Sequence, residues 1–227
     1  MKNLTFLKER KIAHRGIYDN VRIYENTMSS YTRALKYNYM IEMDIRLLSD
    51  GTIICFHDET PDRLLHVDGV IDKLTYDELS YMSKYQIPKF EDVLKIIDGK
   101  VPILIEVRSE YKKGKFEAKL AQILDQYNGL FAIQSFNIKT LKWFYKNRPD
   151  YIIGHLVCKK NFRKDYFFKK YDFLDINILL YSDKRIRKMR EDKLVLGEKI
   201  CNMEEYLAKK DVYDNLVYDN LLEIDGE

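Results

Sequence analysis

Short apolar segments alternate with longer segments of helical periodicity along the whole chain. The apolar segments have the length of strands, and we predict nine strands, the last two from weaker patterns. They cover residues 11–14, 40–45, 52–56, 101–107, 131–134, 152–157, 173–177, 194–200 and 215–218. Helices are predicted between most of them, at residues 26–38, 75–82, 90–97, 115–127, 138–146, 165–171, 184–191 and 203–209. The fold is therefore built from alternating strands and helices.

This alternation predicts an α/β protein whose parallel strands are joined by helical crossovers. Eight such strands would close into a TIM (β/α)8 barrel, in which catalytic groups gather at the C-terminal ends of the strands. Nine candidates compete for eight places, so we expect at least one strand assignment to be wrong. A doubly wound open sheet remains an alternative, because the pattern does not reveal strand order. The chain contains neither GxGxxG nor GxxxxGK[ST], the motifs that usually favour that alternative.

Two features interrupt the regular alternation around the third strand. Asp50 and Gly51 predict a turn that is too short to contain a crossover helix. After His57, the polar residues 59–74 indicate a small insertion after the third strand, lying over the rim of the barrel. No Pro/Gly/Ser-rich linker divides the chain, so we predict that residues 1–227 form a single domain.

Composition excludes several classes of function. The net charge of +3 comes from 39 basic and 36 acidic residues, which gives no indication of nucleic-acid binding. No segment has the length and apolarity of a membrane span, and the N-terminus lacks the apolar stretch of a signal peptide. Cys55, Cys158 and Cys201 lie far apart and are predicted to be reduced thiols, with Cys55 packed inside a strand. These features predict a cytoplasmic protein, and nothing in them indicates its oligomeric state.

Glu42 and Asp44 are the first candidates for chemistry. They are two residues apart in a predicted strand, so both side chains point to the same side, opposite an apolar face. Carboxylates that face inward repel each other unless they are protonated, paired with cations or bridged by a metal ion. The motif taken alone also fits an exposed strand with ordinary alternation.

Glu106 favours an inward-facing carboxylate site over the exposed strand. It lies near the end of an almost continuous apolar segment, and Arg108 follows two residues later. Such segments form strands that are buried on both faces, and polar residues at their C-terminal ends in a barrel are typical of catalysis. With Glu42 and Asp44, it would complete an oxygen-rich site that suits Mg²⁺ or Ca²⁺ better than zinc.

His14 and His57 each follow a predicted strand and are candidates for an acid/base pair. Hydrolysis of a phosphodiester needs a base for the attacking oxygen and an acid for the leaving oxygen. Arg15 could bind phosphate oxygens through its planar guanidinium, although an ordinary surface ion pair fits its position equally well. His66 and His155 lack comparable surroundings and are interpreted as structural or exposed. The combination points to hydrolysis of a phosphate ester.

A series of motifs then occurs in a recognisable order. These are HRG at 14–16, ENT at 25–27, ExD at 42–44, DG at 50–51, HDET at 57–60, IPKFEDVL at 87–94, IEVR at 105–108 and QSF at 134–136. Together they resemble the glycerophosphodiester phosphodiesterases over nearly the whole chain, most specifically in the N-terminal half.

The resemblance implies a TIM barrel with a small insertion after the HD motif. It implies one divalent cation, Mg²⁺ or Ca²⁺, held by Glu42, Asp44 and Glu106, with His14 and His57 as the acid/base pair. The substrate would be a small phosphodiester that is cleaved to glycerol 3-phosphate and an alcohol. Water would attack the phosphorus directly, or the neighbouring glycerol hydroxyl would attack first and form a cyclic phosphate.

The resemblance also implies a phosphate-binding group and two departures from the family pattern. Arg15 would bind the substrate phosphate together with Arg108 and Asn26, and Asn26 would also help to orient that site. Arg108 stands where the family usually has Lys, which keeps the charge but changes its shape. Glu198 stands where the family usually has a Trp that lines the substrate cleft, and Trp143 lies in a predicted helix, where it cannot replace that residue.

These departures leave alternatives open. The same chemistry could act on a glycerol-phosphate-substituted polysaccharide or a teichoic-acid-like diester. A related lysophospholipase D activity is conceivable, as is a non-catalytic, metal-containing barrel that only binds its ligand.

Overall fold

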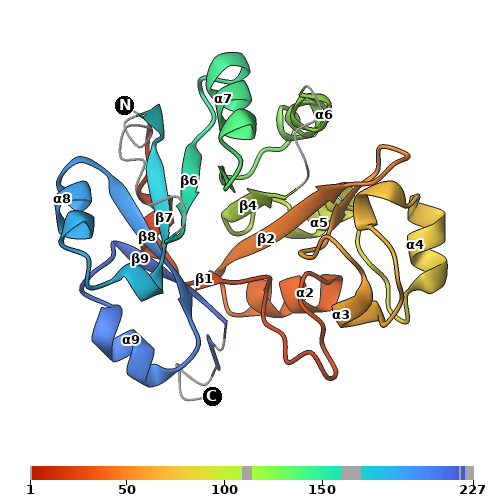
Figure 1. Ribbon diagram of the computed structural model, residues 1–227, viewed down its shortest axis with the longest axis horizontal. Helices are drawn as coiled ribbons and strands as arrows, with labels where there is room; N and C mark the ends of the chain where they lie inside the picture. The colour runs from red at the N-terminus through yellow and green to blue at the C-terminus, as the bar shows by residue number, and fades with distance from the viewer. Residues whose placement is uncertain (1, 109–113, 160–169, 220, 223–227) are drawn as a thin grey trace.

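Nine strands form one sheet, and eight of them close into a parallel barrel (Figure 1). The computed structural model describes residues 2–108, 114–159, 170–219 and 221–222. The strands are β1 (Ile12–Ala13), β2 (Met40–Leu47), β3 (Ile53–Cys55), β4 (Ile103–Val107), β5 (Phe131–Ser135), β6 (Ile153–Val157), β7 (Phe173–Asn177), β8 (Leu194–Ile200) and β9 (Asn215–Tyr218). Strand β1 pairs in parallel with both β2 and β9, which closes the ring. The predicted TIM barrel is confirmed, and the open sheet is excluded.

Strand β3 accounts for the ninth candidate. It runs antiparallel to β2, with Ile45 opposite Cys55, and lies outside the ring of parallel strands. All nine predicted segments therefore contain strands, and the expectation that at least one assignment would fail was wrong. The turn at Asp50 and Gly51 reverses the chain, because it is too short for the crossover that a parallel partner needs. Cys55 is buried in β3, as predicted.

Helices surround the barrel in the order expected from the alternation (Figure 1). They are α1 (Phe6–Glu9), α2 (Met28–Lys36), α3 (Asp62–Leu65), α4 (Tyr76–Met82), α5 (Phe90–Ile97), α6 (Lys115–Leu124), α7 (Ile138–Asn147), α8 (Lys184–Asp192) and α9 (Met203–Lys209), with 3₁₀ turns η1 (Ile71–Lys73) and η3 (Ile178–Leu180). Most of the helix predicted at 165–171 lies outside the described residues. Helix α1 is short and was not predicted; its Phe6 and Leu7 pack with apolar side chains of several barrel strands.

The two faces of β2 carry different kinds of side chain, apolar on one face and mostly charged on the other. Ile41, Met43 and Ile45 belong to the large core that also contains apolar residues of the surrounding helices. Because side chains alternate along a strand, Glu42 and Asp44 face the opposite side, the interior of the barrel. Toward the N-terminal ends of the strands the interior is apolar. That cluster contains Ile12, Met40, Leu104, Ala132, Phe173, Leu194, Leu196 and Val217.

The segment between β3 and α5 forms a smaller apolar cluster of its own. Leu65 of α3, Ile71 of η1 and Leu79 of α4 pack there with Ile54 and Phe56. The predicted insertion, 59–74, contains α3 and η1, whereas α4 follows it and begins at a capping box formed by Thr75 and Glu78. A single domain with this insertion stays a prediction. None of the described helices is long and apolar enough to cross a lipid bilayer.

Candidate active site

Three carboxylates converge inside the C-terminal end of the barrel. Glu42 and Asp44 project from β2 and Glu106 from β4, and the parallel register places Asp44 directly beside Glu106. One oxygen from each of the three side chains lies within 4.8 Å of the others, and all three residues are buried. Oε1 of Glu42 and Oδ1 of Asp44 are buried without a hydrogen-bond partner. The predicted carboxylate cluster therefore exists in the described structure.

The ionisation of the three carboxylates is unequal. Burial raises the pKa of Glu42 well above its usual value, and the neighbouring charge of Asp44 adds to the effect. Burial, together with the charges of Asp44 and Glu198, raises the pKa of Glu106 to about 8 although Arg108 opposes the shift. Burial acts in the same direction on Asp44, but Arg15 and other nearby cations hold its pKa below the usual range. A cation that binds here would displace the protons from Glu42 and Glu106. The donor atoms are carboxylate oxygens, which fit Mg²⁺ or Ca²⁺.

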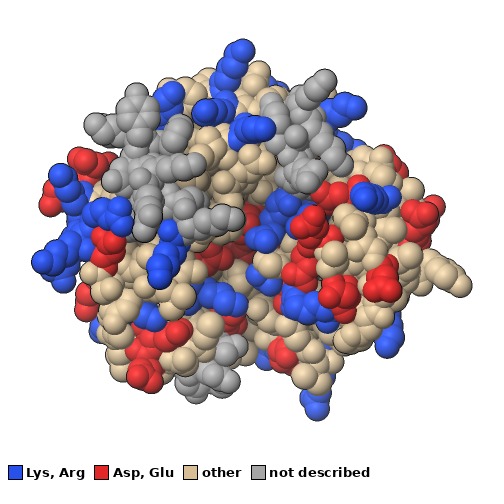
Figure 2. Space-filling model, in the orientation of Figure 1, with Lys and Arg blue, Asp and Glu red and all other residues tan. Residues whose placement is uncertain are grey.

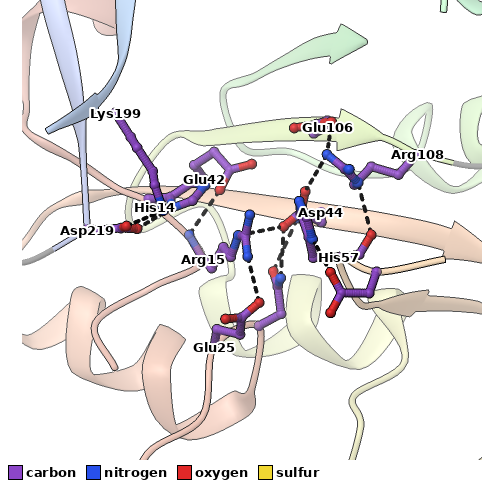
Figure 3. Close-up of polar contacts among 12 residues, drawn as sticks. His14, Arg15, Glu25, Glu42, Asp44, His57, Glu106, Arg108, Lys199 and Asp219 are labelled. Carbon is purple, nitrogen blue, oxygen red and sulfur yellow. Dashed lines mark hydrogen bonds and ion pairs between the residues drawn. The ribbon is translucent and has the colours of Figure 1, made fainter. Parts of the chain in front are cut away.

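His14 follows β1 and lies between two carboxylates (Figure 3). Its Nδ1 bonds to Asp219, and its Nε2 lies 3.5 Å from Oε1 of Glu198. Burial and Arg15 oppose protonation, yet the contacts with Asp219 and Glu198 and the charge of Glu42 raise the pKa of His14 to about 10. The imidazole is therefore held in its protonated form.

Arg15 is placed by an unusual backbone conformation. Its φ of 58° lies in the left-handed region, and its backbone N–H donates to Oε2 of Glu42 at 2.9 Å. The next residue, Gly16, also has a positive φ, of 82°, and approaches Ser30 closely. The guanidinium donates through Nη1 to Oε1 of Glu25 at 2.6 Å and forms an ion pair through Nε with Oδ2 of Asp44 at 3.1 Å. These contacts fix the guanidinium beside the carboxylate cluster.

Asn26 contacts the same cluster from the loop before α2. Its Nδ2 donates to Oδ2 of Asp44 at 2.9 Å, while its Oδ1 accepts from the backbone N–H of Asp44 at 3.2 Å and from Tyr31 at 2.8 Å. The described contacts of this buried amide thus go to Asp44 and Tyr31. They fit the orienting role expected for Asn26, whereas direct contact with a phosphate stays a prediction.

His57 lies on the other side of Arg15 and Asp44 from His14 (Figure 3). Its Nδ1 lies 2.5 Å from Oδ1 of Asp58, and burial lowers the pKa of the imidazole. The two histidines therefore have opposite tendencies at neutral pH, since His14 is kept protonated and His57 is kept neutral.

Arg108 joins the carboxylate cluster to the segment that carries His57. Its Nη1 bonds to Glu106 and lies 3.6 Å from Oδ1 of Asp44, while its Nε donates to the backbone carbonyl of His57 at 2.9 Å. A lysine could not make all of these contacts, because it has a single nitrogen. In the orientation of Figure 1, Figure 2 shows acidic and basic side chains together in a hollow near the middle of this face.

Comparison with known proteins identifies the family. The profile of the glycerophosphoryl diester phosphodiesterase family matches residues 14–215, a span that includes all three carboxylates and both histidines of the site. The chain belongs to this family. A glycerophosphodiester phosphodiesterase of Caldanaerobacter subterraneus is 31% identical over 168 residues, which cover 66% of this chain and 67% of that protein. The chain thus spans about two thirds of the length of this curated relative.

Solved structures share the barrel of this family member. A glycerophosphodiester phosphodiesterase of Thermotoga maritima superposes with a TM-score of 0.77 and 20% identity, covering 92% of this chain and 94% of that one. A phosphodiesterase of Oleispira antarctica, solved in complex with the product sn-glycerol-3-phosphate, superposes with a TM-score of 0.80 and 20% identity, covering 97% and 96% of the two chains. These likenesses establish the fold.

The structure places every residue that the motifs of this phosphodiesterase family member singled out. The carboxylates, His14, His57, Arg15, Arg108 and Asn26 all meet at one end of the barrel. Glu198 also faces this site, because it lies in β8, the seventh strand of the barrel, and its side chain is beside His14. By contrast, His155 packs against Tyr171, at a ring distance of 5.6 Å, and His66 is exposed. Neither is a member of the site.

Sequence reasoning missed several residues that hold the site side chains in place, among them Asp219, Glu25 and Arg63. Asp219 binds His14, Glu25 binds Arg15, and Arg63 binds both Glu25 and Asp58. Asp219 lies in the YDN segment at 218–220, which only loosely resembles the usual terminal strand of the family. Glu25 belongs to the ENT motif, which signalled its neighbourhood but not its role. Arg63 carried no signal, because it lies in the polar segment interpreted as an insertion.

Proposed function

We propose that this family member hydrolyses glycerophosphodiesters to glycerol 3-phosphate and an alcohol. The observation that carries the proposal is the meeting of three buried carboxylates, two histidines and two arginines at one end of the barrel. The product held by the Oleispira antarctica phosphodiesterase supports a small phosphodiester as the substrate. A cytoplasmic location stays a prediction.

The residues proposed to hold one divalent cation are Glu42, Asp44 and Glu106. Two of their oxygens are buried without a hydrogen-bond partner, and carboxylate oxygens are the donors that Mg²⁺ and Ca²⁺ prefer. When bound, the cation would neutralise negative charge on the phosphate oxygens. Asn26 supports this arrangement, because its amide fixes the orientation of Asp44.

Arg15 and Arg108 are proposed to bind the phosphate itself. Arg15 contacts Glu25 through Nη1 and Asp44 through Nε, which leaves Nη2 for a phosphate oxygen. Arg108 is anchored by Glu106 and by the backbone carbonyl of His57. Guanidinium groups fixed in this way bind phosphate with little loss of side-chain freedom.

The two histidines are proposed to divide the proton transfers according to their surroundings. His57, whose pKa is lowered, accepts the proton of the attacking oxygen. His14, whose pKa is raised to about 10, gives its Nε2 proton to the leaving oxygen as the bond between phosphorus and that oxygen breaks. Asp219 positions His14 through Nδ1, which keeps a proton on each ring nitrogen before the reaction.

A phosphorus NMR experiment tests this proposal. Purified protein is incubated with glycerophosphocholine or glycerophosphoglycerol and either Mg²⁺ or Ca²⁺. We expect the resonance of glycerol 3-phosphate to appear, and a transient cyclic phosphate if the glycerol hydroxyl attacks first. The variant His57→Ala should lose the activity, whereas His66→Asn, at an exposed histidine, should keep it. Absence of product from every diester with either cation would refute the proposal.

The position of Glu198 favours a second candidate, in which the leaving alcohol is a polyol or a sugar of a glycerol-phosphate polymer. Its side chain is 19% exposed and lies beside His14, and the next residue, Lys199, pairs with Asp219. A carboxylate acceptor next to an ammonium donor suits the neutral hydroxyl groups of such an alcohol, because each hydroxyl can both donate and accept a hydrogen bond. Exchange of Glu198 for Trp should then reduce hydrolysis of glycerophosphoglycerol more than that of glycerophosphocholine. Equal effects on the two diesters would exclude this candidate.

A further inference from the structure

Glu25 is a buried carboxylate with two guanidinium partners. Its Oε1 accepts from Nη1 of Arg15 and from Nη2 of Arg63, both at 2.6 Å, and its Oε2 accepts from Nη1 of Arg63 at 3.0 Å. Asn20 adds a fourth contact at 3.1 Å. Burial opposes the charge of Glu25, but hydrogen bonding with Arg63 and the charge of Arg15 bring its pKa to about 2. Glu25 therefore links Arg63 to the phosphate-binding Arg15.

Arg63 also contacts Asp58, the residue that follows His57. Nε of Arg63 donates to Oδ2 of Asp58 at 2.6 Å, and Oδ1 of Asp58 lies 2.5 Å from Nδ1 of His57. Asp58 is only partly buried, so another contact is needed to hold its carboxylate in one orientation. With Asp58 fixed, Nδ1 of His57 is occupied and Nε2 remains for the reacting oxygen.

Arg63 is the bridge between these two contacts. Its three nitrogens contact two carboxylates that come from separate loops, one before α2 and one after β3. Its side chain is 44% exposed, so it fills no space in the apolar core. Replacement of the side chain would therefore remove the bridge without leaving a cavity in the core. A lysine at this position keeps the charge but could not contact both carboxylates in the same geometry.

We propose that Arg63 is a positioning residue that sets the location of the phosphate-binding Arg15 relative to His57. It acts through Glu25 on one side and Asp58 on the other, and it does not touch the substrate. The expected loss of activity rests on the proposed function, whereas the expected change in the position of Arg15 and the tautomer of His57 does not. Loss of the bridge frees two groups that must act on the same phosphodiester, and small displacements of such groups reduce rates by about 10²-fold.

The test combines a kinetic and a spectroscopic measurement on Arg63→Ala, Arg63→Lys and the control Arg148→Ala. Arg148 also binds a carboxylate, Asp125, through a forked contact, but on the outer helices. For Arg63→Ala we expect kcat/KM to fall about 10²-fold, with KM raised as well as kcat lowered, and partial recovery on addition of guanidinium at millimolar concentration. Arg63→Lys should lie between the wild type and the alanine variant, and Arg148→Ala should match the wild type.

Nitrogen NMR of the histidine rings provides a readout that does not depend on activity. In the wild type, His57 should be the tautomer with the proton on Nδ1, and in Arg63→Ala it should become a mixture of tautomers. Wild-type kinetics and an unchanged His57 tautomer in a folded Arg63→Ala protein would overturn the inference. If the wild type hydrolyses no glycerophosphodiester, the proposed function fails, while the tautomer of His57 and the binding of inorganic phosphate still test Arg63. An unchanged tautomer with unchanged phosphate affinity would then refute its role.

Discussion

Nε2 of His14, which follows β1, lies 3.5 Å from Oε1 of Glu198, a residue of β8 in the C-terminal part of the chain. Asp219 occupies the other ring nitrogen, so the imidazole is bracketed by two carboxylates. Their negative charges stabilise the protonated ring and suit it to donate a proton to a leaving oxygen. The two contacts have separable consequences.

The charge of Glu198 should determine how far the activity extends toward alkaline pH. A general acid is lost as the pH rises through its pKa, and Glu198 raises the pKa of His14. Glu198→Gln removes that charge, so we expect the alkaline limb of the kcat profile to move to lower pH. The variant Glu204→Gln, at an exposed position of α9, should leave the limb in place. An unshifted limb in Glu198→Gln would show that this carboxylate does not act on His14.

The contact with Asp219 should matter for the rate rather than for substrate binding. An asparagine at 219 cannot act as the same anionic acceptor for Nδ1 of His14, and it removes the stabilising charge. For Asp219→Asn we expect kcat to fall by about 10²-fold or more, with KM changed little. Steady-state kinetics, with the exposed Asp211→Asn as control, measures the effect. A kcat within twofold of the wild type would contradict the positioning of His14 by Asp219.

Binding of the cation should release protons, and its affinity should rise with pH. Without metal the pKa of Glu106 is about 8, because burial and neighbouring carboxylates favour the protonated form. Below that pH a cation must displace the proton, so each displaced proton makes the affinity rise about tenfold per pH unit. Calorimetric titration with Mg²⁺ between pH 6 and 8, in buffers of different ionisation enthalpy, measures both quantities. Affinity independent of pH, with no proton release, would be inconsistent with this cluster as the metal site.

Gly16 should be required for the turn that presents His14 and Arg15. Its φ is 82°, and a Cβ atom there would lie 2.6 Å from Oγ of Ser30 and 2.7 Å from its backbone carbonyl carbon. Gly51 has a similar φ, of 86°, but a Cβ would meet only the flexible end of Lys119, at 3.7 Å. We expect Gly16→Ala to lower the free energy of unfolding by about 2 kcal/mol or more, and Gly51→Ala by about 1 kcal/mol. Chemical denaturation compares them, and equal losses would disprove the role of the Ser30 contact.

Much of the fold and the grouping of the three carboxylates could be predicted, because both depend on local patterns. The alternation in β2 predicted that Glu42 and Asp44 share a face, and the apolar segment before Glu106 predicted a buried neighbour. The direction of β3 was harder to deduce, since the short turn at Gly51 indicates a reversal but not the strand's place in the sheet.

The remaining site contacts depend on distant parts of the chain meeting in space. Asp219 reaches His14 across 205 positions, and Arg63 reaches Glu25 across 38. Such pairs cannot be predicted from hydrophobic periodicity, because the neighbouring residues of an exposed arginine do not reveal whether it bridges two carboxylates. Only the closure of the barrel, which pairs β1 with β9, brings Asp219 beside the first histidine.

Metal-dependent hydrolysis that uses His14 is the central claim, and the release of glycerol 3-phosphate measures it most directly. The assay follows one glycerophosphodiester with the untreated enzyme, after treatment with EDTA, and after restoration of Mg²⁺ or Ca²⁺. His14→Ala is assayed in parallel, with His66→Asn as the control. We expect EDTA to abolish turnover, one of the cations to restore it, and His14→Ala to reduce it by about 10² to 10⁴-fold. Turnover that survives EDTA, or that is unchanged in His14→Ala, would contradict the account.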